Sequence, residues 1–311
     1  MIKAFGGAIS GHRGFSFVEL LVALAIGGGM AAAMVTTLAR QQRFYSSAAA
    51  ILDVRAQLRD AGDILATDIR GSALALGVPV MTDSAIEIFT TVASSIVCTS
   101  GTSAFGLPPA VLASGANLTS MLAVPDTGDL ALVYIARTPP DSATWETHRV
   151  TGFTSRSLAT ACPPSTGFTR AGETSSSAFE VTLASSPSET VRTGAPIRFL
   201  RRARYSLYRS SDNKWYLGYR RCTPTGPSSC AAIQPVAGPY DSYAPAQSGL
   251  AFRYFDRVGL ELPPGSSPAA LARIDIVIRG ASSRQANIAG DYRSRYRDSV
   301  VISVGPRNRV R

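Results

Sequence analysis

The sequence predicts an α+β fold in which one long N-terminal helix packs on an antiparallel, β-rich head. Three patterns predict it. An apolar run covers residues 15–38, helical periodicity continues through residues 39–70, and alternation with a period of two begins after residue 80. We therefore expect a short polar segment at residues 1–14, a long helix at residues 15–75 and a head formed by residues 76–311.

The apolar run at residues 15–38 has the length of a membrane-spanning helix. It contains about two dozen residues, enough to cross the hydrocarbon core of a bilayer once. Lys3 and Arg13 precede it and favour a cytoplasmic N-terminus, whereas Arg40 and Arg43 follow it and weaken that bias. An ordinary secretory signal would place its cleavage site after such a run, and the residues there do not resemble one.

The second part of the helix, residues 39–70, is predicted to be amphipathic. Its apolar residues recur at intervals of three and four, and charged residues lie between them. The periodic set is Ile51, Val54, Leu58, Ala61, Leu65 and Ile69. Gly71, Gly77 and Pro79 are plausible stop signals.

Glu19 is the one carboxylate inside the apolar run. A charged residue at the centre of a membrane helix costs about 2.5–3.5 kcal/mol on insertion scales, so it usually has a role. The alternative is a shallow Glu19 that reaches the interface. Gly14 and Phe15 lie just before it, and glycine before a peptide bond leaves the backbone open to a protease.

The stretch Gly-Phe-Ser-Phe-Val-Glu-Leu-Leu-Val-Ala-Leu-Ala, from Gly14, resembles the N-terminal signature of type IV prepilins and type II secretion pseudopilins. The resemblance implies a pilin-like fold and cleavage after Gly14 by the prepilin peptidase, on the cytoplasmic side of the membrane. It also implies N-methylation of Phe15, and pairing of Glu19 with the new amine during assembly. The implied location is the bacterial inner membrane with the head in the periplasm, and then a filament at or near the cell surface. The implied partners are the peptidase, membrane lipid, and major and minor pilins bound through the helix.

Three glycines, Gly27, Gly28 and Gly29, interrupt the apolar run, and each costs about 1 kcal/mol of helix propensity relative to alanine. One interpretation is close approach of helices in the membrane. The other is a hinge where the helix stretches on entering the filament, and the resemblance favours it. The alternative is that these small residues arose by neutral drift and have no specific role.

The head is predicted to be built of strands. Candidate strands lie at residues 85–91, 130–136, 148–153, 179–183, 196–208, 215–221, 249–255, 272–279 and 299–304. Residues 99–128 and 155–176 are rich in Ser, Thr, Gly, Ala and Pro and are expected to form surface loops.

The four cysteines allow three disulfide pairings. Cys222 and Cys230 flank a turn-forming stretch, so a local bridge is expected there, and Cys98 would then pair with Cys162. An even cysteine count in an exported chain favours disulfides. The alternative is four free buried thiols.

Stretches of the second half, such as Ser-Gly-Leu-Ala-Phe-Arg-Tyr-Phe-Asp, resemble the larger minor pilins of the PilW kind. This resemblance implies a minor pilin that primes or caps a type IV pilus. A minor pseudopilin of a type II secretion filament is the alternative within the same class.

The net charge of +10 allows a third interpretation, a DNA-binding pilin. Its contacts would be Arg201, Arg202, Arg204 and Arg209, which lie among aromatic residues as in single-strand binders. A solvated arginine-rich surface is the alternative. Catalytic and nucleotide-binding motifs are absent, and the only histidines are His12 and His148, so we expect no enzyme, no cofactor and no metal.

Overall fold

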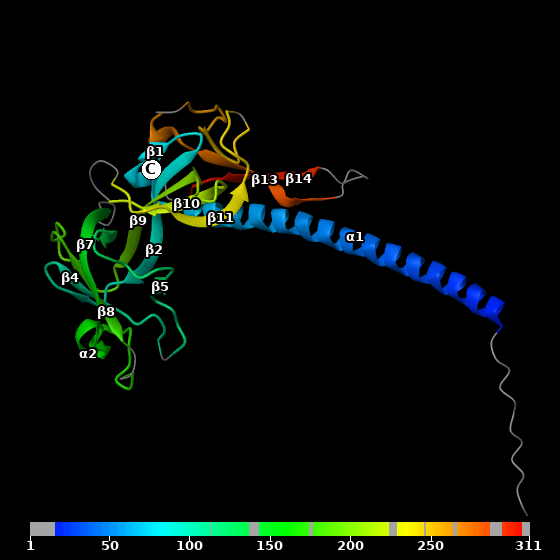
Figure 1. Ribbon diagram of the computed structural model, residues 1–311. Coiled ribbons are helices and arrows are strands. Elements are labelled where there is room, and N and C mark those ends of the chain that lie inside the picture. Colours follow the sequence, from blue (N-terminus) through cyan, green and yellow to red (C-terminus); the bar gives the residue numbers. More distant parts are fainter. Residues whose placement is uncertain are drawn as a thin grey trace, which may run out of the picture. The chain divides into compact units, whose positions relative to one another are not determined.

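A computed structural model describes residues 16–112, 114–136, 143–173, 177–223, 229–245, 247–263, 266–286 and 294–306. Its first element is the 55-residue helix α1 (Phe17–Gly71), drawn in Figure 1 as one continuous coil. Two sheets follow, together with the short helical segments η1 (Leu74–Leu76), α2 (Leu158–Ala161), η3 (Pro164–Thr166) and η4 (Pro268–Ala270). The predicted α+β layout, a long N-terminal helix before an antiparallel β-rich head, is confirmed.

The larger sheet has eleven strands within the described residues. These are β1 (Val80–Met81), β2 (Ala85–Ile96), β3 (Thr99–Ser100), β4 (Ala104–Leu107), β5 (Ser120–Met121), β6 (Leu130–Ile135), β7 (Thr144–Arg156), β8 (Ala178–Leu183), β9 (Pro196–Arg209), β10 (Trp215–Arg221) and β11 (Gln234–Tyr240). The main path runs β1-β2-β9-β6-β7-β8-β4-β3, while β5 pairs with β2 and β10 pairs with both β9 and β11. Neighbours are antiparallel, and β2 and β9 form the longest ladder.

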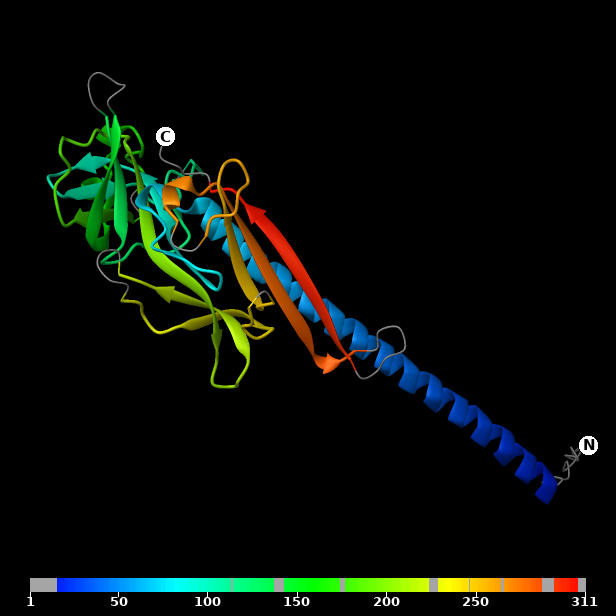
Figure 2. The same ribbon diagram turned by 90° about the horizontal axis from the view of Figure 1, so that it is seen from above.

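The smaller sheet has the order β12-β13-β14, with β12 (Leu250–Phe255), β13 (Arg273–Gln285) and β14 (Arg295–Val304). Figure 2 shows β13 in orange and β14 in red, side by side. Along β14 the residues alternate between exposed and partly buried positions. This is the pattern of a sheet with one face packed and one face in solvent.

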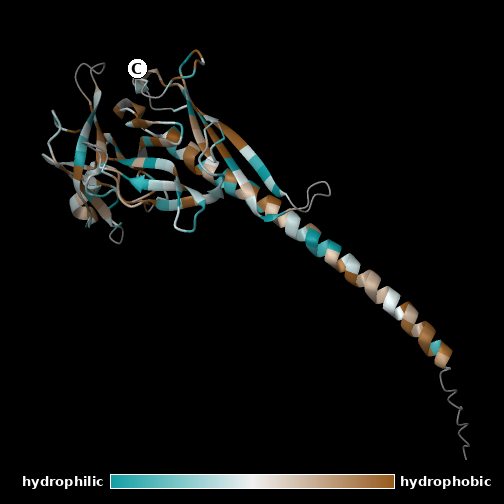
Figure 3. Cartoon of the chain, turned by 45° about the horizontal axis from the view of Figure 1, so that its top comes forward, coloured by the Kyte–Doolittle hydropathy of each residue, from teal (hydrophilic) through white to brown (hydrophobic). Residues whose placement is uncertain are grey.

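Two compact units make up the chain, residues 1–53 with 282–296 and residues 54–281 with 297–311. In the first unit, the apolar side chains of residues 17–38 are exposed almost throughout. Figure 3 shows the first part of α1 as mostly hydrophobic. Exposed apolar surface on this scale is expected where a membrane or another protein covers it.

In the second unit, the remaining turns of α1 pack on strands. The buried positions Val54, Leu58, Ala61, Leu65 and Ile69 follow the predicted spacing. The sixth predicted position, Ile51, belongs to the first unit and is only half-buried. On this buried side, a Cβ atom at Gly62 would lie 2.1 Å from Cδ1 of Ile302 on β14, so glycine lets the helix and strand approach closely.

The main core of the head lies on one face of the larger sheet. Phe105, Ile135, Ile197 and Phe199 are fully buried there, and they come from β4, β6 and β9. The β-branched and aromatic residues that form these strands suit a pleated, buried surface. This core includes part of a segment that was expected to be loop.

Two predictions about the head were wrong. Residues 99–128 were expected to form a surface loop, but they contain β3, β4 and β5. In β4, Phe105 and Leu107 are buried and the strand pairs with β8. Residues 155–176 include the end of β7 as well as α2 and η3. Strand β11 was not predicted, and it contains two prolines. Among the described strands it pairs only with β10, and an edge position tolerates the missing N–H of proline.

Candidate functional site

Glu19 lies in the first turn of α1, where it forms part of a helix cap. Its Oε2 accepts a hydrogen bond of 2.9 Å from the backbone N–H of Ser16, and Oγ of Ser16 accepts one of 3.3 Å from the N–H of Val18. This reciprocal arrangement is a variant of the capping box in which the Ser16 hydroxyl accepts from the second helical residue, and it satisfies donors that a helix start leaves without partners. The capping role was not predicted, although Ser-x-x-Glu before an apolar run is its signal. Gly14 and Phe15 lie outside the described residues.

The surroundings of Glu19 would also suit a pairing with a positive group. It is the only acidic residue between residues 15 and 52, and it is exposed. The helix macrodipole places partial positive charge at the same end and favours a carboxylate there. A new amine at residue 15 would form four residues before this carboxylate. The described residues offer it no other acidic group on the first part of α1.

α1 itself can cross a membrane, by its length and composition. Gly27, Gly28 and Gly29 are helical within it, and a Cβ atom at any of them would meet nothing within 4 Å. Contacts in the described residues therefore do not require glycine at these positions. The hinge stays a prediction.

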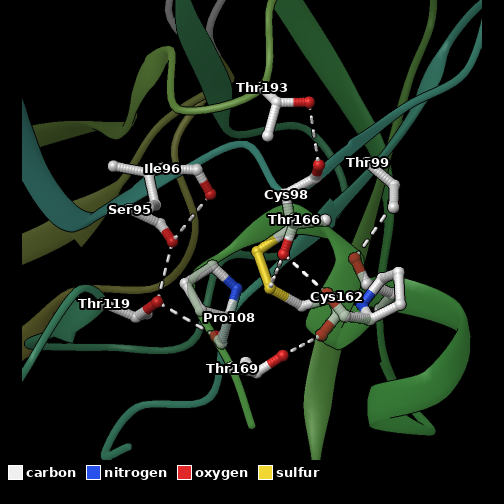
Figure 4. Close-up of a disulfide and its surroundings, with 12 residues drawn as sticks. Ser95, Ile96, Cys98, Thr99, Pro108, Thr119, Cys162, Thr166, Thr169 and Thr193 are labelled. Carbon is white, nitrogen blue, oxygen red and sulfur yellow. Dashed lines mark hydrogen bonds between the residues drawn. A yellow bond between two sulfur atoms is a disulfide. The ribbon is translucent and has the colours of Figure 1, made fainter.

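The structure joins Cys98 to Cys162 and Cys222 to Cys230, the two pairs expected from the sequence. The first disulfide connects the segment just after β2 with the residue that follows α2, and Figure 4 shows the threonines around it. The Thr169 hydroxyl donates to the carbonyl of Cys162 at 2.6 Å, and the Thr193 hydroxyl donates to that of Cys98 at 3.2 Å. This disulfide joins the two segments within a small buried cluster that also contains Leu158 and Ala178.

The second disulfide lies near the carboxylate of Glu87. The carboxylate of Glu87 and the sulfurs of Cys222 and Cys230 could together bind a metal ion if both sulfurs were thiolates. Because Cys222 and Cys230 are bonded to each other, neither offers a thiolate, and the cluster does not have the donors that a metal site needs.

The four arginines expected to contact DNA do not form one free cationic patch. Arg201 makes two hydrogen bonds to the buried carboxylate of Asp129, at 3.0 and 2.7 Å, and a third to the carbonyl of Val124. The hydrogen bond to Asp129 raises the pKa of Arg201. A guanidinium held in this way is poorly placed to bind phosphate.

Arg202 is buried and forms an ion pair with Glu87, which is fully buried on β2. It also donates to the carbonyl of Thr223 at 2.9 Å. Arg204 is half-buried, and only Arg209 is exposed. The structure therefore holds two of the four arginines, Arg201 and Arg202, in ion pairs with buried carboxylates of the head.

Comparisons with known proteins find one similarity. The family described as "Prokaryotic N-terminal methylation motif" matches residues 9–35, which include Gly14, Phe15 and Glu19. No curated protein and no solved structure matches the chain. The motif supports the type IV pilin and pseudopilin class for this chain and indicates a substrate of prepilin peptidase.

Proposed function

We propose that this chain is a minor pilin-like subunit that is cleaved after Gly14 and built into a type IV pilus, where it primes or caps the filament. The cleaved chain begins at Phe15, whose amine is methylated. The helix α1 holds the precursor in the inner membrane and later packs among the helices of other pilins. The head lies in the periplasm and is carried outward with the filament. The role is structural and not enzymatic.

The observation that carries the proposal is the order of features at the N-terminus. A glycine is followed by phenylalanine, the acidic Glu19 and a helix whose first half exposes apolar side chains along its length. A buried assembly of such helices would place the amine and Glu19 in a medium of low dielectric constant. There an ion pair is much stronger than in water and little weakened by salt.

The choice of a minor pilin rests on the resemblance of the second half to the PilW kind. A minor pseudopilin would use the same helix and the same processing. Deletion of the chain distinguishes them. Loss of surface fibres with normal secretion of exoproteins is expected for the pilin, and the reverse for the pseudopilin.

The role of Glu19 can be tested with a pair of substitutions, because it has two functions to separate. Glu19→Gln keeps a capping-box side chain but removes the charge. Glu19→Ala removes both. We expect both variants to be cleaved at Gly14 and both to be absent from sheared fibres, because assembly depends on the charge.

The control is Ser16→Ala, which removes one half of the cap and keeps the carboxylate, and it should assemble. Incorporation of Glu19→Gln at the wild-type level would show that Glu19 acts only as a helix cap. The amounts in the membrane and in the sheared fraction are measured by immunoblotting against the head.

A further inference from the structure

β14 has an open edge. In the smaller sheet it pairs with β13 on one side, and no other described strand pairs with it. The opposite edge of the sheet is closed: on β12 the N–H of Phe252 donates to the carbonyl of Asp83, and the carbonyl of Tyr254 accepts from Leu262, both at 2.7 Å. For residues 299–304, the described part of the chain supplies no backbone hydrogen bond outside the ladder with β13.

The composition of this edge suits pairing with another strand. Residues 299–304 read Ser-Val-Val-Ile-Ser-Val, with four β-branched residues and no charge, proline or glycine. Soluble proteins normally protect such an edge with charges, prolines, bulges or a covering segment. Six-residue segments of this composition pair readily with other chains. An unprotected edge of this kind is expected to be covered in the functional assembly.

The two faces of β14 differ, which fixes how an added strand would lie. Ile302 packs on the helix at Gly62, whereas Val301 keeps 60% of its surface exposed. Asp298, on the helix-facing side, contacts Arg55 at 3.2 Å. A strand added beside β14 would therefore have one face toward this side of α1 and the other toward solvent.

The charges around the edge indicate the chemistry of the partner. Arg55 and Arg297 are exposed, and Arg59 lies one turn beyond Arg55 on the same side of α1. Asp298 pairs with Arg55, and Asp275 on β13 accepts a hydrogen bond from Ser303 and pairs with Arg273. Arg297 is the exposed charge that adjoins the open segment of the strand. A second copy of the chain would bring like charges together, and juxtaposed like charges are costly.

We propose that the open edge of β14, at residues 299–304, binds an extended segment of another polypeptide that bears carboxylates, which adds a strand to the smaller sheet. Main-chain hydrogen bonds supply the affinity of such strand addition, and the exposed Arg297 beside the edge favours an acidic segment. This inference goes beyond the proposed function, and it does not depend on cleavage after Gly14.

The test uses a photoreactive amino acid placed singly at Ser299, Val301 and Ser303 of the full chain in its native host, with Val258 as an exposed control site. We expect all three edge positions to cross-link one segment of another protein. The cross-linked residues should shift by two for each two-residue step along β14, and carboxylates should lie close to them. Equal yield at Val258, contacts without such a register, or cross-links to a second copy of the chain would each overturn the proposal.

A charge reversal provides the second measurement. Arg297→Glu should lower the cross-linking yield from Val301 by about tenfold, because it places like charges across the new interface. Arg149→Glu reverses an exposed arginine on β7 and should leave the yield unchanged. Thermal unfolding of each variant establishes that the head is folded. An equal loss of yield in both variants, or none in Arg297→Glu, contradicts an acidic partner.

Discussion

At the scale of single residues, Asp68 connects the helix to the larger sheet. Its carboxylate on α1 accepts a hydrogen bond from the hydroxyl of Tyr205 on β9. Burial raises the pKa of Asp68 above its ordinary value of 3.8, and the hydrogen bond from Tyr205 offsets part of this rise. Burial and the nearby carboxylate also raise the pKa of Tyr205.

This raised pKa predicts how stability depends on pH. Between pH 3.8 and the folded-state pKa of Asp68, the folded protein keeps a proton that the unfolded chain has lost. The contribution of Asp68 to the free energy of unfolding therefore falls as pH rises through this interval, and it is constant above it. Asp68→Asn can still accept the hydrogen bond but cannot ionise, so its stability relative to wild type should rise over the same interval.

Urea unfolding of the purified protein at a series of pH values measures this effect. Tyr205→Phe is the informative second variant, because it removes the hydrogen bond that lowers the pKa of Asp68. Tyr205→Phe should therefore raise the folded-state pKa of Asp68, so that stability continues to fall up to a higher pH than in wild type. If the free energy of unfolding had the same pH dependence in wild type and in Asp68→Asn, the raised pKa of Asp68 would be contradicted.

Glu87 and Arg202 form the second residue-scale prediction. Both side chains are buried, so removal of one partner leaves a charge without compensation in a medium that solvates it poorly. Glu87→Ala should lower the free energy of unfolding by about 3–5 kcal/mol. Glu180→Ala, which breaks the more exposed pair with Arg156, should cost less than about 1 kcal/mol.

Denaturant unfolding of the two variants under the same conditions makes the comparison. A cost for Glu87→Ala no larger than that for Glu180→Ala would show that Arg202 reaches water when its partner is absent. Arg202 would then be available for other contacts, including the DNA contact that its burial disfavours.

At the scale of elements, the second part of α1 is expected to carry much of the stability of the head. Leu65 is fully buried at the centre of the apolar stripe, whereas Leu52 on the same helix is 65% exposed. Leu65→Ala should destabilise the protein by about 2–5 kcal/mol, through lost apolar burial and the cavity that remains. Leu52→Ala should change stability by less than about 0.5 kcal/mol.

Thermal and denaturant unfolding in detergent measure both changes. Leu52 is the matched control, because the chemical change is the same and only the environment differs. Similar effects of the two substitutions would mean that the stripe does not pack on the strands as described.

The elements also show why some structure could be predicted from the sequence and some could not. The spacing of Leu58, Ala61 and Leu65 predicted the buried side of α1, because a helix repeats every 3.6 residues whatever it packs against. The short strand β4 could not be predicted, because its four residues become a strand only through pairing with β8. Such non-local pairing leaves little trace in a local pattern.

Among the candidate site residues, too, local patterns could be predicted from the sequence and long-range contacts could not. Gly14, Phe15 and Glu19 lie within six residues of one another, so the amino-acid sequence alone reveals their pattern. The partners of Arg201 and Arg202 are distant in the chain, since Asp129 and Glu87 lie 72 and 115 residues away. The arginine run therefore suggested a nucleic-acid surface, whereas its first two members pair with carboxylates of the head.

At the scale of the whole molecule, the proposed function depends on one covalent event. The helix, the cap at Ser16 and Glu19, and the exposed apolar surface are compatible with a membrane anchor that is never processed. Cleavage after Gly14 is what distinguishes a filament subunit from a signal-anchored β domain. It also creates the amine that Glu19 is proposed to neutralise.

The most direct test is the intact mass and N-terminal residue of the protein purified from its native membrane, in cells with active prepilin peptidase. We predict a chain that begins at methylated Phe15, and a Gly14→Leu variant that keeps residues 1–14. A wild-type chain that still begins at Met1 would contradict the central claim and leave a β-rich head on an uncleaved anchor.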